Sequence, residues 1–290
     1  MEMENGRIQL GRFGIWWSGS WRSETTPLAA VAYEMERLGY RSFWLSGGFD
    51  AGLHRRFREL IDATERVVVA SGILSVWPNE PTSVGEEVAG LGDRFLLGIG
   101  ASHAPVVEAK GGHYERPLEK VSEFLDGLDS APVPVPAGRR ILAALGRKML
   151  RLAGERSIGA HPYFVPVEHT LRAREVLGPD PVIATEVAVV LEADPGAARA
   201  AARSYTSGYL RLPNYANNLI DLGWAVDDLQ SSGSDRLVDA LIPWGTPESV
   251  AARLREHLDA GADHVCIQVV RDHSGGFPLD EYRELASAIL

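Results

Sequence analysis

The order of hydrophobic and polar positions divides the chain into short apolar runs separated by longer amphipathic stretches. The runs are nearly continuous and rich in β-branched and aromatic residues, which is typical of parallel strands covered on both faces. Strands are predicted at 13–16, 42–45, 66–74, 95–99, 140–144, 157–160, 181–192 and 263–270. Helices are predicted at 27–39, 54–63, 81–91, 118–128, 148–153, 167–177, from 194 onward, at 246–260 and at 279–290.

Strands and helices alternate eight times in 290 residues, a length that suits one closed barrel of such units. We therefore expect an α/β protein with a TIM (β/α)8 barrel in a single domain over residues 1–290. An open doubly wound sheet is the alternative. The segment 212–244 interrupts the rhythm before the last strand–helix unit, and it predicts an insertion beside the mouth of the barrel.

Charge and composition narrow the class of partner. The 39 acidic residues outnumber the 29 basic ones, and the net charge of −10 argues against binding to nucleic acid or to an anionic membrane surface. No apolar run reaches the ~18 residues of a membrane span, and no secretion signal is visible, so a soluble cytoplasmic protein is expected. The single cysteine, Cys266, lies in an apolar run that predicts a buried structural thiol.

In a barrel of this kind the working residues follow the carboxyl ends of the strands. Four of the seven tryptophans fall on the first and third of these loops: Trp16, Trp17, Trp21 and Trp77. Large flat side chains at a barrel mouth suit a planar aromatic ligand. The alternative is that individual tryptophans only cap the barrel core.

Two further loops are suited to contact a ligand through the backbone. Gly98 and Gly100 follow the fourth predicted strand and permit close approach of a flat molecule, although the third glycine of a dinucleotide fingerprint is missing. Leu145, Gly146 and Arg147 stand at a strand-to-helix junction, where free N–H groups and a cation could hold a phosphate. A solvated basic start to a helix is the alternative for the second loop.

Candidates for acid–base chemistry are histidines near the predicted mouth, namely His103, His113 and His161. For each of them a hydrogen-bonded structural role is the alternative. The sequence contains no HExxH, CxxC, Walker or GxSxG motif, so metal-dependent hydrolysis and serine-nucleophile chemistry have no support.

Several stretches, taken together and in order, resemble one family. They are FGIW (13–16), ASGIL (70–74), DRFLLGIGASHAP (93–105), AALGRKML (143–150), GAHPY (159–163), LPNYANNL (212–219) and AGADHV (260–265). The chain resembles the luciferase-like monooxygenase superfamily from end to end, and specifically its coenzyme F420-dependent oxidoreductase branch. The resemblance implies a TIM barrel, usually dimeric, that binds the deazaflavin F420 at the mouth and transfers a hydride to or from a small organic substrate.

The resemblance also implies roles for particular residues. A non-prolyl cis peptide, which lies in a bulge of the third strand and supports the deazaflavin ring, maps to Gly72 and Ile73. Residues of the ring-side or ribityl region map to Gly98, Gly100 and Ser102. The phosphate turn maps to Leu145, Gly146 and Arg147, and the loop after the sixth strand maps to His161 and Tyr163.

This chain departs from the family pattern at two acids. Ser46 and its neighbouring glycines stand at the end of the second strand, where an acid or a histidine is common, and Ala101 replaces a frequent glutamate. His103 and Tyr163 are then the remaining candidates for proton transfer, with Trp16, Trp17 and Trp77 as pocket walls. Two alternatives stay open, an FMN-dependent monooxygenase of the same superfamily and a barrel that binds without catalysis.

Overall fold

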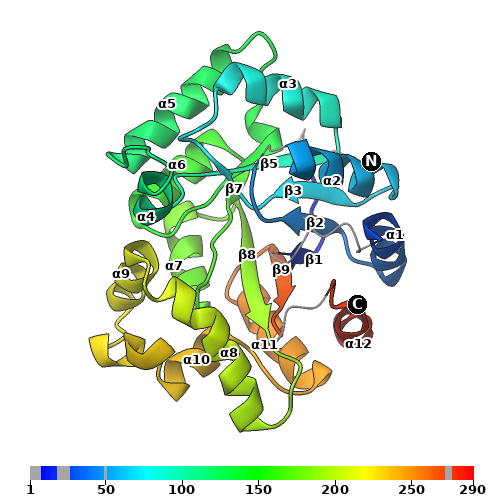
Figure 1. The fold of residues 1–290 in the computed structure, drawn as a ribbon, viewed down its shortest axis with the longest axis vertical. Helices are drawn as coiled ribbons and strands as arrows, with labels where there is room; N and C mark the ends of the chain where they lie inside the picture. The colour runs from blue at the N-terminus through cyan, green and yellow to red at the C-terminus, as the bar shows by residue number, and fades with distance from the viewer. Residues whose placement is uncertain (1–7, 18–26, 49–50, 272–275) are drawn as a thin grey trace.

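The computed structural model describes residues 8–17, 27–48, 51–271 and 276–290, which form a barrel of parallel strands surrounded by helices (Figure 1). The strands are β1 (Phe13–Trp17), β2 (Ser42–Leu45), β3 (Val68–Ser71), β4 (Leu74–Ser75), β5 (Phe95–Gly100), β6 (Arg140–Leu142), β7 (Gly159–Ala160), β8 (Val182–Val189) and β9 (His264–Val269). They pair in the order β3-β2-β1-β9-β8-β7-β6-β5-β4, and a further pairing of β3 with β5 closes the sheet. Because β3 and β4 are two parts of one barrel strand, the protein is the eight-stranded TIM barrel that the sequence predicts.

Helices cover the outside of the barrel between successive strands. They are α1 (Leu28–Leu38), α2 (Ala51–Asp62), α3 (Pro81–Leu91), α4 (Ala104–Glu108), α5 (Pro117–Ser130), α6 (Arg147–Arg156), α7 (Val167–Leu177), α8 (Pro195–Tyr209), α9 (Pro213–Asp221), α10 (Asp235–Leu241), α11 (Pro247–Asp259) and α12 (Leu279–Ile289). Short 3-10 turns, η1 (Ala137–Arg139) and η2 (Val226–Ser232), complete the fold. The short helix α4 is not predicted from the sequence, which has no amphipathic repeat there.

Each face of the sheet is apolar, as parallel strands require. Side chains inside the barrel include Trp16, Trp44, Ala70, Leu96, Ile141, Ala184 and Cys266. Their sequence neighbours, including Ile15, Phe43, Val69, Phe95, Leu142, Ile183 and Val265, face the helices and form the main core. Cys266 is fully buried and its thiol is free, so the expectation of a structural cysteine is confirmed.

The third barrel strand is broken into β3 and β4. The apolar pattern predicts one continuous strand over 66–74, whereas the family resemblance implies a bulge within it. Its pairing with β5 moves by one residue between β3 and β4, so the break is a bulge that holds an extra residue. The peptide bond between Gly72 and Ile73 in this bulge is cis, as the resemblance implies. The bulge turns the backbone toward the mouth of the barrel.

Two other predicted strands, 140–144 and 181–192, end earlier than their apolar runs. β6 stops at Leu142 and β8 at Val189, because the following residues leave the sheet to form loops at the mouth. Directly after β8, Val190 forms one isolated β-bridge with Trp244. Apolarity continues past the strand ends since Ala144 and Val190, in these loops, are still buried.

The segment predicted as an insertion contains α9, η2 and α10. Together with α8 these elements share a second apolar cluster, which includes Ala202, Tyr215, Leu219, Leu237 and Leu241. Figure 1 shows α8, α9 and α10 grouped at the lower left, beside the end of β8. They extend the wall of the barrel mouth.

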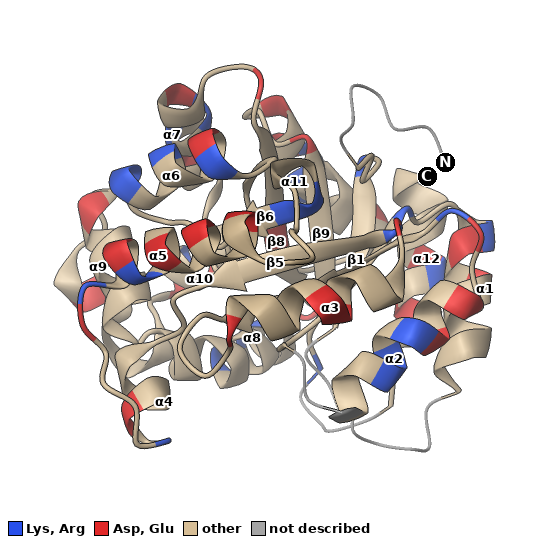
Figure 2. Cartoon of the chain, turned by 90° about the horizontal axis from the view of Figure 1, so that it is seen from above, with Lys and Arg blue, Asp and Glu red and all other residues tan. Residues whose placement is uncertain are grey.

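Charged residues lie mainly on the outer helices, while the strands labelled in Figure 2 are almost free of them. Glu186 of β8 and Arg140 of β6 are exceptions that are buried. In the described part of the chain, every helix is too short or too polar to cross a membrane.

Candidate active site

The carboxyl ends of the barrel strands surround a cavity of about 410 Å³, a size that suits a drug-sized or cofactor-sized molecule. We call it the mouth cavity. It is lined by Trp16, Ser46, Gly72, Ile73, Ala101, Ser102, His103, Tyr114, Pro117, Ala143, Ala144, Leu145, Gly146, Met149, His161, Tyr163, Tyr209, Asn214 and Tyr215. Most of these side chains are aromatic or aliphatic, so its wall is predominantly apolar.

A second, more polar cavity of about 440 Å³ lies next to the first and shares Leu145, Gly146 and Asn214 with it. We call it the polar cavity. Its other lining residues are Arg147, Arg172, Asn217, Asn218 and Asp221. It contains the start of α6, where Gly146 is the N-cap residue and backbone N–H groups are free. The two cavities thus give a flat ligand with an anionic tail an apolar place for the ring and a cationic place for the tail.

Most of the residues singled out in the sequence come together here. Trp16, Gly72, Ile73, Ser102, His103, Leu145, Gly146, His161 and Tyr163 line the mouth cavity, and Arg147 lines the polar cavity. Trp17, Trp77, Gly98 and Gly100 line neither cavity. Trp21 falls outside the described residues.

Two of the tryptophans have other roles than the expected one. Trp17 follows Trp16 on β1 and therefore points to the opposite face of the sheet, where it packs in the main core with its ring 5.5 Å from that of Phe277. Trp77 supports the wall from behind. Its Nε1 donates to the carbonyl of Ala101 over 2.6 Å, and its ring lies 5.1 Å from that of Tyr114.

Gly98 and Gly100 are needed for packing and do not contact the mouth cavity. A Cβ atom at Gly98 would lie 2.0 Å from the carbonyl oxygen of Ser71, and one at Gly100 would lie 2.7 Å from Cδ1 of Ile73. The expected contact with a flat ligand is therefore replaced by an indirect role, since these glycines let β5 pass behind the bulge that does line the cavity.

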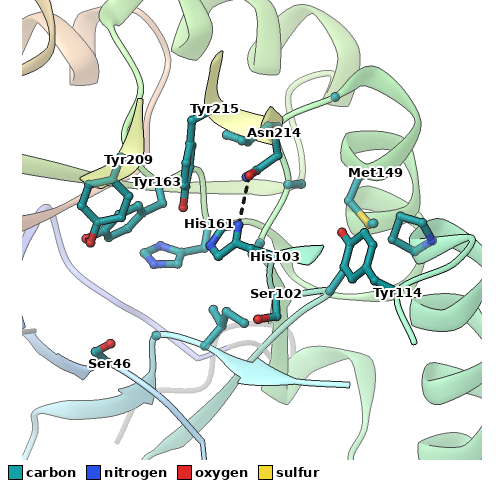
Figure 3. A pocket seen from close by; sticks show the side chains of 18 of the residues that line it. Ser46, Ser102, His103, Tyr114, Met149, His161, Tyr163, Tyr209, Asn214 and Tyr215 are labelled. Carbon is teal, nitrogen blue, oxygen red and sulfur yellow. Dashed lines mark hydrogen bonds between the residues drawn. The ribbon is translucent and has the colours of Figure 1, made fainter. Parts of the chain in front are cut away.

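His103 is half-buried and its Nδ1 lies 3.0 Å from Oδ1 of Asn214 on α9 (Figure 3). Burial lowers the pKa of His103 below its usual 6.5, with the contact to Asn214 opposing this effect. The ring is then mainly neutral at pH 7, which makes it a weak candidate for the acid. His113 is exposed, pairs with Glu115 over 2.8 Å, and lines neither cavity.

His161 is buried, and its protonation is fixed by its neighbours. Nδ1 lies 2.7 Å from the carbonyl oxygen of Ala184, which can only accept, so Nδ1 carries the hydrogen. Burial lowers the pKa of His161 to about 4, and its ring stacks on Trp44 at 4.4 Å. Nε2 therefore carries a lone pair, and it has no partner among the described residues. This atom can accept a hydrogen bond from a ligand in the mouth cavity.

Tyr163 belongs to a group of phenols that the sequence did not reveal. Its hydroxyl lies 2.8 Å from those of both Tyr209 and Tyr205, and 3.1 Å from Oε1 of Gln268. Behind them, Glu186 is 1% exposed. Burial raises the pKa of Tyr163 well above its usual value, so this phenol keeps its proton at neutral pH.

Several residues that line the mouth cavity were not identified from the sequence, because they do not directly follow the strand ends. Tyr209, Asn214 and Tyr215 lie on α8 and α9, far along the chain from the strand ends, and Tyr114 and Met149 reach the cavity from its other side (Figure 3). Glu186 lies in a long apolar run. Ala184 faces the inside of the barrel, and Glu186 lies two residues further along the same strand, so its carboxyl also faces inward. This spacing was the signal in the sequence that could have identified Glu186.

Buried donors without partners mark where a ligand fits. Nε1 of Trp16, at the mouth cavity, and Nδ2 of Asn218, at the polar cavity, have no partner among the described residues. Such groups are rare in folded proteins, because an unsatisfied buried donor is costly. A ligand that spans both cavities and carries acceptor atoms would satisfy both donors.

Comparison with protein families agrees with this geometry. The model of the luciferase-like monooxygenases matches residues 18–264. The chain belongs to the luciferase-like monooxygenase family. Members of this family are oxidoreductases and monooxygenases that act on small molecules. A comparison with curated proteins finds no match.

Solved structures similar to this luciferase-like protein have low sequence identity and the same fold. The F420-dependent tetrahydromethanopterin reductase from Methanopyrus kandleri aligns with a TM-score of 0.72 and 16% identity, over 97% of this chain and 99% of the reductase. An F420-dependent secondary alcohol dehydrogenase, in complex with an F420–acetone adduct, gives 0.71 and 14%, over 97% and 100%. The FMN-bound oxygenating constituent of 3,6-diketocamphane monooxygenase from Pseudomonas putida gives 0.66 and 14%, over 96% of each chain.

Proposed function

We propose that this luciferase-like protein is an F420-dependent oxidoreductase that transfers a hydride between the deazaflavin and a small organic substrate. The observation that carries the proposal is the joined pair of cavities, an apolar one at the barrel mouth and a cationic one at the start of α6. When bound, the deazaflavin supplies the hydride chemistry. The solved structures with the two highest of the three TM-scores above belong to F420-dependent enzymes.

Named residues divide the work of binding. Trp16, Ile73 and Met149 give the ring apolar surface in the mouth cavity. Gly146 and Arg147 offer backbone N–H groups and a guanidinium to the phosphate. The bulge with Ile73 would hold the ring and the start of α6 with Gly146 would hold the phosphate, so different elements would hold the two ends of the cofactor.

Orientation and proton supply also fall to residues of this chain. Nε2 of His161 can accept a hydrogen bond from an N–H or O–H group, since Nδ1 donates to the carbonyl of Ala184. Tyr163 presents a protonated phenol to the mouth cavity and is our candidate for the proton donor. The mainly neutral ring of His103 is hydrogen-bonded to Asn214 at the boundary of the two cavities.

The alternative is an FMN-dependent monooxygenase, which the similarity to the FMN-bound protein favours.

Titration of the purified protein with F420 and with FMN, followed by tryptophan fluorescence, separates the two. We expect saturable quenching by F420 that is reduced in Trp16→Phe, which removes a wall tryptophan, and retained in Trp17→Phe, which removes a core one. Binding of FMN but not F420 would support the alternative. If neither binds at tens of micromolar, the protein is a barrel without this cofactor chemistry.

The homodimer that the resemblance implies and the cytoplasmic location that the sequence predicts stay predictions. Sedimentation equilibrium of the full chain tests the first, and imaging of a tagged full-length protein in its own host tests the second.

A further inference from the structure

Glu186 is a carboxyl placed inside the barrel without a cation. It lies on β8 at the inward parity, below the floor of the mouth cavity that it does not itself line. Oε2 lies 3.3 Å from the backbone N–H of Phe164 and Oε1 lies 3.5 Å from the hydroxyl of Tyr205. Among the described residues, no Lys, Arg or His forms an ion pair with it. Two long contacts are poor compensation for a buried negative charge.

The surroundings of Glu186 therefore favour its protonated form. Burial raises the pKa of Glu186 to about 8, and the two hydrogen bonds from Phe164 and Tyr205 oppose this only in part. At pH 7 the group is then mainly a neutral carboxylic acid. It holds a proton that it can release close to physiological pH.

A chain of hydroxyls connects this acid to the mouth cavity. From Glu186 it passes to Tyr205, then over 2.8 Å to Tyr163, and over a further 2.8 Å to Tyr209. Tyr163 and Tyr209 line the mouth cavity, whereas Tyr205 and Glu186 do not. Because each hydroxyl can both donate and accept, every link can be polarised toward the cavity or toward Glu186.

The other groups around Glu186 do not compete for this role. They come from the loop after β7, from α8, α9 and α12 and from β9, and they are Tyr163, Tyr205, Tyr209, Tyr215, Tyr282, Cys266 and Gln268. Burial raises the pKa of each phenol and of the thiol, and the glutamine does not titrate. His161 is neutral at pH 7 because its pKa is about 4. Within this described cluster, Glu186 is the group that changes charge near neutrality.

We propose that Glu186 is the proton store of the mouth cavity and exchanges its proton with the cavity through Tyr205 and Tyr163. The carboxyl O–H breaks as its proton moves to the oxygen of Tyr205. The proton of Tyr205 moves to Tyr163, and that of Tyr163 moves to an acceptor oxygen or nitrogen in the cavity. Both phenols end neutral, Glu186 ends as a carboxylate, and no electron is exchanged.

The use of this proton store in a reaction rests on the proposed function, which is hydride transfer. Hydride addition to a C=O or C=N bond leaves an oxygen or nitrogen that takes up one proton, and the reverse reaction releases one. The store would supply that proton even though Ser46 and Ala101 stand where the family commonly has acids. Glu186 and Tyr205 act here through Tyr163 and are positioning residues rather than catalytic ones.

Infrared spectroscopy of the full chain without cofactor tests the protonation of Glu186. A pH titration should show the carbonyl band of a buried carboxylic acid that disappears with a midpoint near 8. We expect this band to be missing in Glu186→Gln, which keeps the side chain's size. Identical spectra of the wild type and this variant would overturn the proposal.

Exchange in D₂O tests the route. If Glu186 exchanges through the phenols, Tyr205→Phe should slow the replacement of its proton by deuterium by about tenfold or more, because exchange then waits for local opening. The control is Tyr40→Phe, which removes another buried phenol that donates to the carbonyl of Tyr282 over 2.9 Å. Equal exchange rates in Tyr205→Phe and the wild type would show that the proton takes another path.

Addition of F420 separates this inference from the proposed function. Saturating F420 should slow the exchange in the wild type, because it closes the cavity end of the chain of hydroxyls. If F420 does not bind while the band and the effect of Tyr205→Phe persist, the cofactor assignment fails and the proton store stands. If F420 binds but Tyr205→Phe changes nothing, the proton store fails and the cofactor assignment stands.

Discussion

Gly146 shows at the scale of one residue how a ligand site can be tested without disturbing the fold. It is the N-cap of α6 with an ordinary negative φ of −75°, and a Cβ atom there would have no neighbour within 4 Å. Side chains therefore fit at this position. Asp and Asn are both favourable N-cap residues, so either should leave the helix at least as stable as glycine does.

We expect Gly146→Asp to weaken F420 binding by about tenfold or more, because it sets a carboxylate against the phosphate at the helix start. Gly146→Asn adds nearly the same atoms without the charge and should bind close to the wild type. The measurement is the fluorescence titration of each variant. Equal affinities in the two variants would place the phosphate elsewhere.

The tautomer of His161 is a second consequence at this scale. With Nδ1 donating to Ala184 and the pKa near 4, His161 should stay neutral and Nδ1-protonated throughout the neutral range. Nitrogen-15 NMR of labelled protein measures this directly, with an His161→Gln variant to assign the signal. A titration midpoint near 6.5 would contradict the burial and the acceptor role of Nε2.

At the scale of an element, the broken third strand decides the shape of the cavity. The bulge between β3 and β4 brings Gly72 and Ile73 to the wall, and β5 can follow only because Gly98 has no side chain. The sequence predicted the strand and these residues. The break at these residues was implied only by the family resemblance, because a run of apolar residues carries no signal for a one-residue shift in pairing.

We expect Gly98→Ala to destabilise the protein by about 1–3 kcal/mol or more, since its Cβ would meet the backbone oxygen of Ser71. Gly90→Ala is the control. Gly90 lies in α3 with no neighbour within 4 Å of a Cβ atom, so alanine there should stabilise by about 0.5–1 kcal/mol. Urea unfolding of both variants gives the comparison. A Gly98→Ala protein as stable as the wild type would show that the strands can move apart at the bulge.

At the scale of the whole molecule, buried titratable groups make stability depend on pH in two directions. Burial lowers the pKa of His161, His169 and His264 to about 4 and that of His257 to about 3, from 6.5. Between 6.5 and about 4 the unfolded chain binds more protons at these groups, so their contribution to stability is lost as the pH falls. Glu186 acts oppositely, because its pKa is raised from 4.5 to about 8 and the folded state holds the extra proton.

We therefore expect stability to fall steeply on acidification below about pH 6.5, by about 1.4 kcal/mol per pH unit for each proton taken up on unfolding. The contribution of Glu186 should decline from about pH 4.5 up to about pH 8, so below pH 6.5 it offsets about one of the four histidine protons. Urea unfolding across this range measures both limbs. Glu186→Gln should flatten the alkaline limb and make the acid limb steeper by about one proton above pH 4.5, and an unchanged alkaline limb would contradict the raised pKa of Glu186.

The local pattern of apolar and polar residues determined the strands, the helices and part of the candidate site. Apolar runs of strand length, separated by amphipathic stretches, specify parallel strands and covering helices, because each depends on residues close in the chain. The same reasoning placed Gly146 and Arg147 at the start of a helix, and His161 and Tyr163 at a strand end beside the cavity.

Tertiary structure alone decided the chemistry inside the barrel. Whether Trp16 or Trp17 faces the cavity, whether His161 is neutral and whether Glu186 keeps a proton depend on burial by elements far away in the sequence. Desolvation and hydrogen-bond partners are set by contacts across the barrel, such as those of Tyr205 on α8 with β8 and with the loop after β7. No periodicity along the chain encodes these contacts.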